Sequence, residues 1–165
     1  MYNEASRTIE DFQSVARQYC TLVENSTTLS RDEFLKEVHV LLPLLVAYAA
    51  RLPDVSPDSE NLNDEKVEQG PIIEAINRTL GEQHSNHFYE LIFDPWEKGD
   101  NQPVASSLAI DLAEIYADIK EGFAALERGG PLNDVLWEWK YGFESHWGRH
   151  ATQSLVAVHS LLVDW

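Results

Sequence analysis

The sequence predicts an all-α fold, a single-domain bundle of about six helices whose last two long helices form an antiparallel hairpin. Apolar residues recur at spacings of three and four along most of the 165-residue chain, and no segment shows the alternation typical of a strand. The hydrophobic content of 44% is enough for a core of its own. We therefore expect one helical domain over residues 1–165.

Three helices are predicted in the first half of the chain. Residues 8–24 carry apolar side chains at helical spacing. The next helix begins at a capping box formed by Ser30 and Glu33 and is closed by Pro53. A third is expected over residues 70–80, which open with Gly-Pro and are followed by a glycine. These helices supply one half of the predicted bundle.

A long acidic loop separates the second and third of these helices. Residues 53–69, PDVSPDSENLNDEKVEQ, contain six acids, one lysine and two prolines. Such a composition buries little apolar surface and interrupts helices. It predicts a solvated, mobile loop.

The second half of the chain predicts three more helical segments. A short helix is expected over residues 84–93, and a long one over 104–128 that ends before Gly129. The last helical region fills the rest of the chain. A break is predicted near Gly142 or Gly148, because glycine weakens a helix interior.

The chain is strongly acidic, with 28 Asp and Glu against 12 Lys and Arg and a formal net charge of −16. This charge argues against a nucleic-acid binder, which needs a cationic surface, and against docking on anionic lipid. Self-repulsion that keeps a soluble protein dispersed is the simple interpretation. An acidic mimic of nucleic acid, binding a protein that normally binds nucleic acid, is the alternative.

The sequence predicts a cytoplasmic location. A single cysteine, Cys20, cannot form an internal disulfide and favours a reducing compartment. The first residues, MYNEASRTIEDF, lack the basic and apolar regions of a signal peptide. The longest apolar run, VHVLLPLLVAYAA, is too short to span a bilayer and contains a proline.

The long helix predicted over residues 104–128 carries a ridge of carboxylates. Asp111, Glu114 and Asp118 share one flank of this helix at spacings of three and four, beside an apolar stripe that faces the core. Like charges at these spacings repel one another by about 0.2–0.5 kcal/mol per pair. We therefore expect a neighbouring group that offsets the repulsion among these three carboxylates.

Two histidines of the last helical region supply candidate partners. His146 and His150 lie four residues apart in FESHWGRHA and fall on the apolar face of the helix. If the turn before them makes a tight antiparallel hairpin, Asp111 faces His150 and Glu114 faces His146, with Asp118 one turn further along. Buried imidazoles need hydrogen-bond partners, which such carboxylates provide.

This cluster of three carboxylates and two histidines has two interpretations. In the one we favour, the carboxylates accept hydrogen bonds from the imidazoles and lock the helices together, and no cofactor is expected. In the other, Asp111, Glu114, Asp118, His146 and His150 bind a divalent metal, since these ligands suit zinc, iron or manganese. The protein would then be a metal-dependent enzyme, a hydrolase or an oxidoreductase, that activates bound water. The sequence identifies no catalytic residue.

Three segments resemble a known family. SSLAIDLAEIYADIKEGFAAL, HFYELIFDPWE and WEWKYGFESHWGRHATQSLVAVHSLL are similar to stretches of the bacterial proteins grouped as domain of unknown function 5063. The resemblance covers most of the chain and implies an all-helical bundle. It implies no activity and no catalytic residues. Where the family has paired aspartates, this chain has Ile110-Asp111.

Protein binding is the function we expect, with another protein as partner and neither nucleic acid nor membrane; an enzyme is the less favoured alternative. Trp137, Trp139 and Trp147 wrap around the last helical region, so not all of them can face the core. An exposed indole among them would mark a partner surface. The acidic loop over residues 53–69 is the second observation that favours this function.

Overall fold

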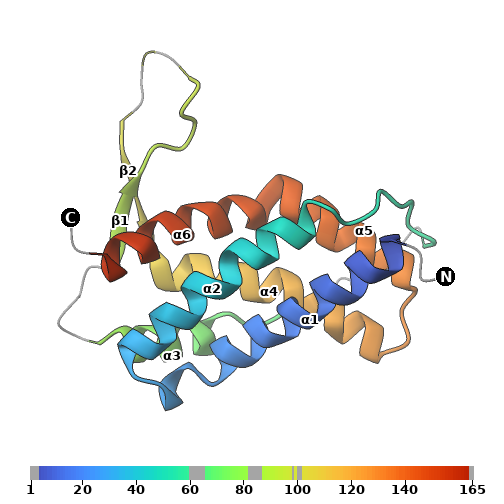
Figure 1. Cartoon of the computed structure of the whole chain (residues 1–165), viewed down its shortest axis with the longest axis horizontal. Helices are drawn as coiled ribbons and strands as arrows, with labels where there is room; N and C mark the ends of the chain where they lie inside the picture. The colour runs from blue at the N-terminus through green and yellow to red at the C-terminus, as the bar shows by residue number, and fades with distance from the viewer. Residues whose placement is uncertain (1–3, 60–65, 82–86, 98, 100–101, 164–165) are drawn as a thin grey trace.

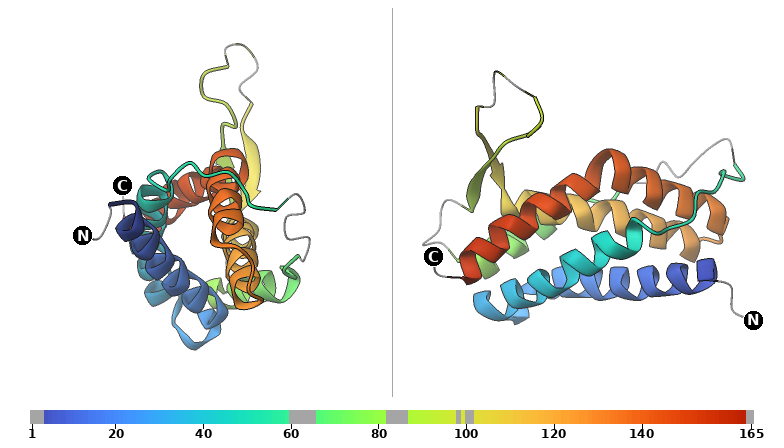
Figure 2. Two further views of the ribbon diagram at one scale, coloured as in Figure 1. Left: turned by 90° about the vertical axis from the view of Figure 1, so that its right-hand side faces the viewer. Right: turned by 45° about the horizontal axis from the view of Figure 1, so that its top comes forward.

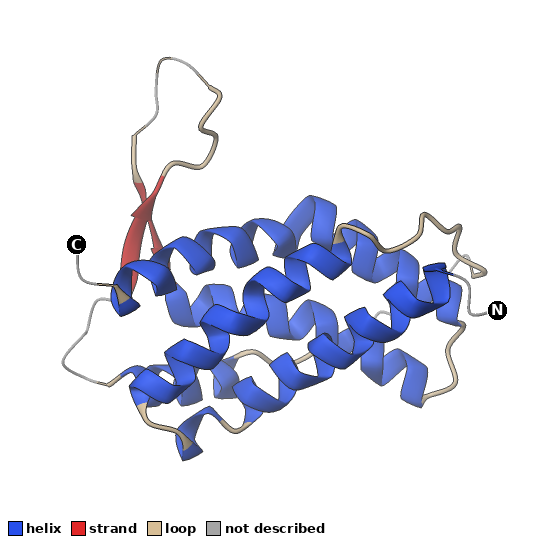
Figure 3. Ribbon diagram, viewed as in Figure 1, coloured by secondary structure: helices blue, strands red, loops and turns tan. Residues whose placement is uncertain are grey.

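A computed structural model describes residues 4–59, 66–81, 87–97, 99 and 102–163. It forms a helical bundle from one end of which a β-hairpin projects (Figures 1 and 3). The predicted all-α fold class is confirmed. In chain order the elements are α1 (Glu4–Glu24), a 3₁₀ turn (Ser26–Thr28), α2 (Arg31–Ala49), α3 (Gly70–Leu80), β1 (Phe88–Leu91), β2 (Val104–Ser107), α4 (Leu108–Glu127), α5 (Leu132–Gly142) and α6 (Gly148–Leu162).

The core lies between α1, α2, α4 and the helix made by α5 and α6 (Figure 2). Trp139 of α5 packs on Phe12 of α1 with ring centroids 5.2 Å apart, and Trp147 lies 6.4 Å from the same ring. The buried hydroxyl of Tyr19 donates to the carbonyl of Leu112, 2.8 Å away, which joins α1 to α4. Within the described ranges, no helix has an apolar stretch long enough to cross a membrane.

The two segments α5 and α6 form one continuous helix, joined by a π turn over Phe143–Trp147. The N–H of Gly148 donates to the carbonyl of Phe143, five residues earlier. A Cβ on Gly148 would lie 2.2 Å from that oxygen, so the turn requires glycine there. The interruption predicted near Gly142 or Gly148 is this π turn, which lies between the two glycines and through which the helix continues without a break. After a turn at Gly129 (φ +82°), this helix packs back along α4 as the predicted hairpin.

Capping signals place the starts of two helices. Ser30 and Glu33 form the predicted capping box at α2, in which the Ser30 oxygen accepts from the N–H of Glu33 and the Glu33 carboxylate accepts from the N–H of Ser30. Ser107 caps α4 by accepting from the N–H of Ile110. The long predicted helix thus begins at Leu108 rather than at residue 104, where the chain is still extended.

The β-hairpin corrects the prediction of a short helix over residues 84–93. β1 and β2 are antiparallel, with Tyr89 opposite Ser106. Each strand has only four residues, too few for a visible alternation, and their pairing is a contact between distant parts of the chain that local periodicity cannot reveal. His84, at the start of the predicted helix, lies outside the described residues.

The described ends of the acidic loop are attached to the bundle. Asp134 of α5 accepts hydrogen bonds from the backbone N–H groups of Asp58 and Ser59. Glu121 of α4 accepts from the N–H of Val67 at 3.1 Å and from the Nζ of Lys66 at 2.9 Å. Residues 60–65 lie outside the described part of the chain, so the mobility of the loop stays a prediction.

Candidate functional site

The carboxylate of Asp111 is the centre of the cluster that the sequence predicts. It comes from the first turn of α4, and its side chain is 2% exposed. The Nδ1 atom of His150, on α6, lies 2.9 Å from Oδ1 of Asp111. An ionised carboxylate only accepts, so Nδ1 of His150 carries a proton and donates it to Asp111. The predicted pairing of these two residues is confirmed.

Two further donors to Asp111 come from the β-hairpin. The hydroxyl of Tyr89 in β1 lies 2.5 Å from Oδ2, and the hydroxyl of Ser106 in β2 lies 2.8 Å from the same atom. Neither residue was predicted, because no local pattern indicates that this segment is a hairpin. A signal did exist for β2, since two serines directly before an apolar helix mark an N-cap. Nothing in the local sequence singles out Tyr89.

His146 is held by the other two carboxylates of α4. Its Nδ1 atom lies 2.8 Å from Oδ2 of Asp118, and its Nε2 atom lies 3.8 Å from Oε2 of Glu114. Gln69 donates to the same Glu114 oxygen at 3.1 Å. The sequence predicted Glu114 as the direct partner, whereas Asp118 is the nearer one. A π turn contains one more residue than an α turn, and this moves His146 around the helix relative to the expected register.

The electrostatics of the cluster favour the protonated form of His150. Among the described residues, no lysine or arginine forms an ion pair with Asp111, Glu114 or Asp118. The hydrogen bond to Asp111 raises the pKa of His150, which burial only partly opposes. Burial raises the pKa of the Asp118 carboxyl, although its bond to His146 acts in the opposite direction. His150 and Asp118 therefore retain their protons to higher pH than isolated side chains would.

The geometry agrees with a hydrogen-bonded cluster that connects helices. The two imidazole rings meet edge to face, with centroids 4.9 Å apart. In the part of the chain that is described, no three His, Cys, Asp or Glu side chains are arranged to hold a metal ion. Metal binding by these residues stays a prediction. Stoichiometric metal in the purified protein, lost in a His146→Ala, His150→Ala double variant, would establish it.

Two of the three tryptophans of the last helical region are buried, and an interaction site at the third, Trp137, stays a prediction. Trp139 and Trp147 are 1% and 0% exposed and belong to the core. Trp137 is half-buried, and its ring stacks on Tyr141 at a centroid distance of 4.9 Å. The prediction of an interaction site at Trp139 and Trp147 is therefore wrong, because the π turn and α5 direct both rings inward.

The most exposed aromatic residues of the described chain lie on the hairpin. We call residues 88–107 the arm; it comprises β1, β2 and the segment between them. Trp96 is 88% exposed and Phe93 is 63% exposed, with Ile92 beside them also exposed. The guanidinium of Arg149, on α6, lies 3.8 Å from the centroid of the Phe93 ring. The arm thus presents an apolar surface away from the core.

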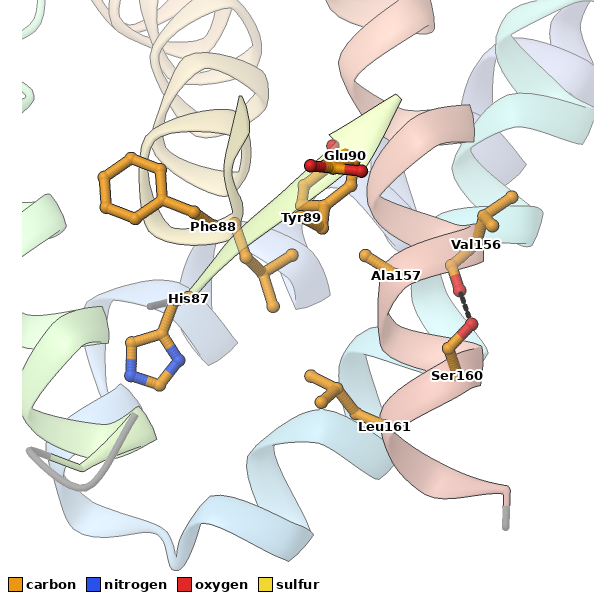
Figure 4. A pocket seen from close by; sticks show the side chains of 9 residues that line it. His87, Phe88, Tyr89, Glu90, Val156, Ala157, Ser160 and Leu161 are labelled. Atoms are coloured by element: carbon orange, nitrogen blue, oxygen red, sulfur yellow. Dashed lines mark hydrogen bonds between the residues drawn. The ribbon is translucent and has the colours of Figure 1, made fainter. Parts of the chain in front are cut away.

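Two hollows separate the arm from α6. One, of about 690 Å³, lies below the connecting segment of the arm, where Phe93 and Trp96 face Phe143 and Val156. The other, of about 240 Å³, lies between β1 and α6. Figure 4 shows this second hollow, with Tyr89 on one wall and Ala157 on the other. The arm and α6 are therefore not packed tightly against each other.

Comparisons with known proteins support one family. No curated protein matches the chain. A crystal structure of protein BF1032 from Bacteroides fragilis is similar over 99% of this chain and 96% of that one, with a TM-score of 0.77 and 22% sequence identity, which shows the same fold. The model of the family described as domain of unknown function (DUF5063) matches residues 3–164. The chain belongs to the DUF5063 family.

Proposed function

We propose that this protein is a binding module that uses the arm to dock on another protein. Trp96 is the observation that carries the proposal, because 88% of its surface is exposed and it lies between the two strands of a hairpin that projects from the bundle. Exposed tryptophan is uncommon on a surface without a partner, and tryptophan is enriched among the residues that dominate binding energy. Phe93 and Ile92 extend the same apolar surface.

The charge of the arm supports a specific kind of partner. Residues 88–107 contain four acids and one lysine, and the whole chain carries −16. A second copy of the chain would bring like charges together, which disfavours self-association through the arm. The fitting occupant is a different protein, with an apolar pocket that takes the indole and a basic rim that faces the acids. The same charge disfavours nucleic acid and anionic membranes as partners.

A cytoplasmic location fits this proposal. Cys20, the single cysteine, is buried in α1, and burial raises the pKa of its thiol to about 12. A thiol in this state is a poor nucleophile and a poor partner for disulfide exchange. The fold therefore makes no use of cysteine chemistry, as is typical of proteins from reducing compartments.

Photo-crosslinking from the arm tests the proposal. A benzophenone amino acid in place of Trp96 should capture one defined protein in the native cell, whereas the same group at the exposed Gln18 of α1 should not. The captured protein is then purified and its affinity for the intact chain is measured. Trp96→Ala should weaken binding by roughly 30-fold, as expected of a hot-spot residue.

The matched control is Leu132→Ala, which removes an exposed apolar side chain at the start of α5, outside the arm. It should leave the affinity unchanged. An affinity that Trp96→Ala does not alter would overturn the proposal. Binding that ignores Trp96 but falls steeply with salt would indicate the acidic mimic of nucleic acid instead.

A further inference from the structure

The direction of the arm depends on what holds its base, because the arm projects beyond the helices (Figures 1 and 2). β2 runs directly into α4, and the N–H of Leu108 donates to the carbonyl of His87 at 2.8 Å. These contacts tie the end of the hairpin to the start of α4. They do not by themselves fix the angle at which the hairpin leaves the bundle.

A single carboxylate holds both strands at this base. Tyr89 and Ser106 are opposite each other in the β1–β2 ladder, and both hydroxyls donate to Asp111. A carboxylate bonded to a pair of residues on neighbouring strands restrains rotation of the hairpin about its own axis. Bonds to a charged acceptor are stronger than those between neutral groups.

Asp111 is itself fixed by the bundle. It is buried in the first turn of α4, where the helix dipole favours a negative charge, and it accepts from His150 of α6. Burial and the neighbouring carboxylate raise the pKa of Tyr89, so its hydroxyl remains a donor. A buried carboxylate needs such donors, and removing them leaves a costly unpaired charge.

Packing between β1 and α6 is incomplete at this point, although the Tyr89 ring itself packs against the core. The hollow of about 240 Å³ separates β1 from α6 next to Tyr89 (Figure 4). Three of the side chains that line it are exposed, Phe88, Val156 and Leu161. The hydrogen bonds to Asp111 thus add a directional restraint that the packing of β1 on α6 does not supply.

We propose that Asp111 is the positioning residue of the arm. Held by its hydrogen bond with His150, the carboxylate accepts hydrogen bonds from Tyr89 and Ser106. These bonds set the direction in which Trp96 meets the partner. The inference rests on the proposed function, since it assigns the cluster on α4 and α6 to the same docking surface. The His–carboxylate cluster predicted to lock the helices together thereby also positions the arm.

Distance measurement within the isolated chain tests this role. Spin labels on Gln102→Cys in the arm and Ser14→Cys on α1 occupy exposed positions, and Cys20 is too buried to compete. The native sequence should give one narrow distance distribution. The double variant Tyr89→Phe, Ser106→Ala keeps Asp111 and His150, and it should broaden the distribution at least twofold. Amide exchange of residues 88–91 and 104–107 should become on the order of tenfold faster.

Tyr116→Phe is the matched control, because Tyr116 of α4 also donates to a carboxylate, but to that of Glu24 on α1, which joins two helices of the bundle. It should leave the label distance and the exchange of the arm unchanged. Exchange that accelerates equally in α1 and in the arm of the double variant would show general destabilisation and overturn the inference. An unchanged distance distribution in the double variant would also overturn the inference, even if crosslinking from position 96 captures a partner. Failed capture together with a broadened distribution would overturn the proposed function alone.

Discussion

Tryptophan occupies two opposite environments in this protein. In the bundle, Trp139 and Trp147 are enclosed by apolar side chains, and the indole of Trp139 donates to the carbonyl of Ile119 at 3.1 Å. On the arm, Trp96 lies in solvent. The same side chain therefore stabilises the fold in one region and offers binding surface in the other. Burial and satisfied polar atoms, rather than residue type, distinguish the two uses.

The two regions are also held together by different forces. The bundle is stabilised by apolar burial along its helices, which is non-directional and additive over many residues. The arm is a two-stranded hairpin, a structure that is marginal on its own, and it depends on directed hydrogen bonds to Asp111. A change in the bundle should thus alter global stability, whereas a change in the arm should act locally.

The largest contrast is expected between Trp139→Ala and Trp96→Ala. Trp139 packs on Phe12 and Phe123, with ring centroids 5.2 and 5.0 Å away, so its loss leaves a cavity and an unpaired carbonyl. We expect a loss of about 3–5 kcal/mol in the free energy of unfolding. Trp96→Ala should change it by less than about 0.5 kcal/mol. Urea titrations of both variants measure the difference, and a comparable loss for Trp96 would show that the arm is part of the core.

A smaller effect is expected from Gly148→Ala, which tests the π turn. The added Cβ would meet the backbone oxygen of Phe143 at 2.2 Å, and backbone cannot move aside as a flexible side chain can. We expect a loss of about 2–3 kcal/mol in the free energy of unfolding. Gly70→Ala is the control, because nothing lies within 4 Å of a Cβ there. Equal stability of the two variants would contradict the role given to Gly148.

The sequence predicted the bundle well because its determinants are local. The capping box at Ser30 and the turn at Gly129 mark boundaries through the conformations of single residues. The pairing of Asp111 with His150 followed from helical periodicity and one short turn. Such features depend on neighbours in the chain, and physical rules for helices describe them directly.

The arm was missed because its determinants are not local. Residues 88–91 form a strand only by pairing with 104–107, and Tyr89 reaches Asp111 only once that pair exists. Trp96 gave no signal either, since exposure is a property of the fold and not of the residue. The π geometry of the turn over Phe143–Trp147 was not predicted either, although Gly148 is the residue that permits it.

Arg149→Gln tests the contact between the arm and the bundle. The guanidinium of Arg149 stacks on the exposed ring of Phe93, a cation–π contact of about 0.5–1 kcal/mol at such sites. Its removal should accelerate amide exchange around Phe93 a few-fold and leave the melting temperature unchanged. Arg17→Gln offers a control, because Arg17 makes the same contact with Phe123 within the bundle. A global change of stability in Arg149→Gln alone would contradict the local role.

The smallest expected effect is the pH dependence of stability that arises from His150, whose partner Asp111 binds both the bundle and the arm. The bond to Asp111 raises the pKa of His150 in the folded protein above its ordinary value of 6.5. The protonated imidazole then stabilises the fold fully below pH 6.5, and this contribution is lost as the pH rises through the folded-state pKa. The difference in the free energy of unfolding between the native sequence and His150→Gln should therefore shrink by on the order of 0.5 kcal/mol between pH 6 and pH 9. Urea titrations across this range measure it. A difference that grows with pH would mean that the neutral imidazole is the form that the cluster prefers, and that Asp111 gains no charged partner from α6.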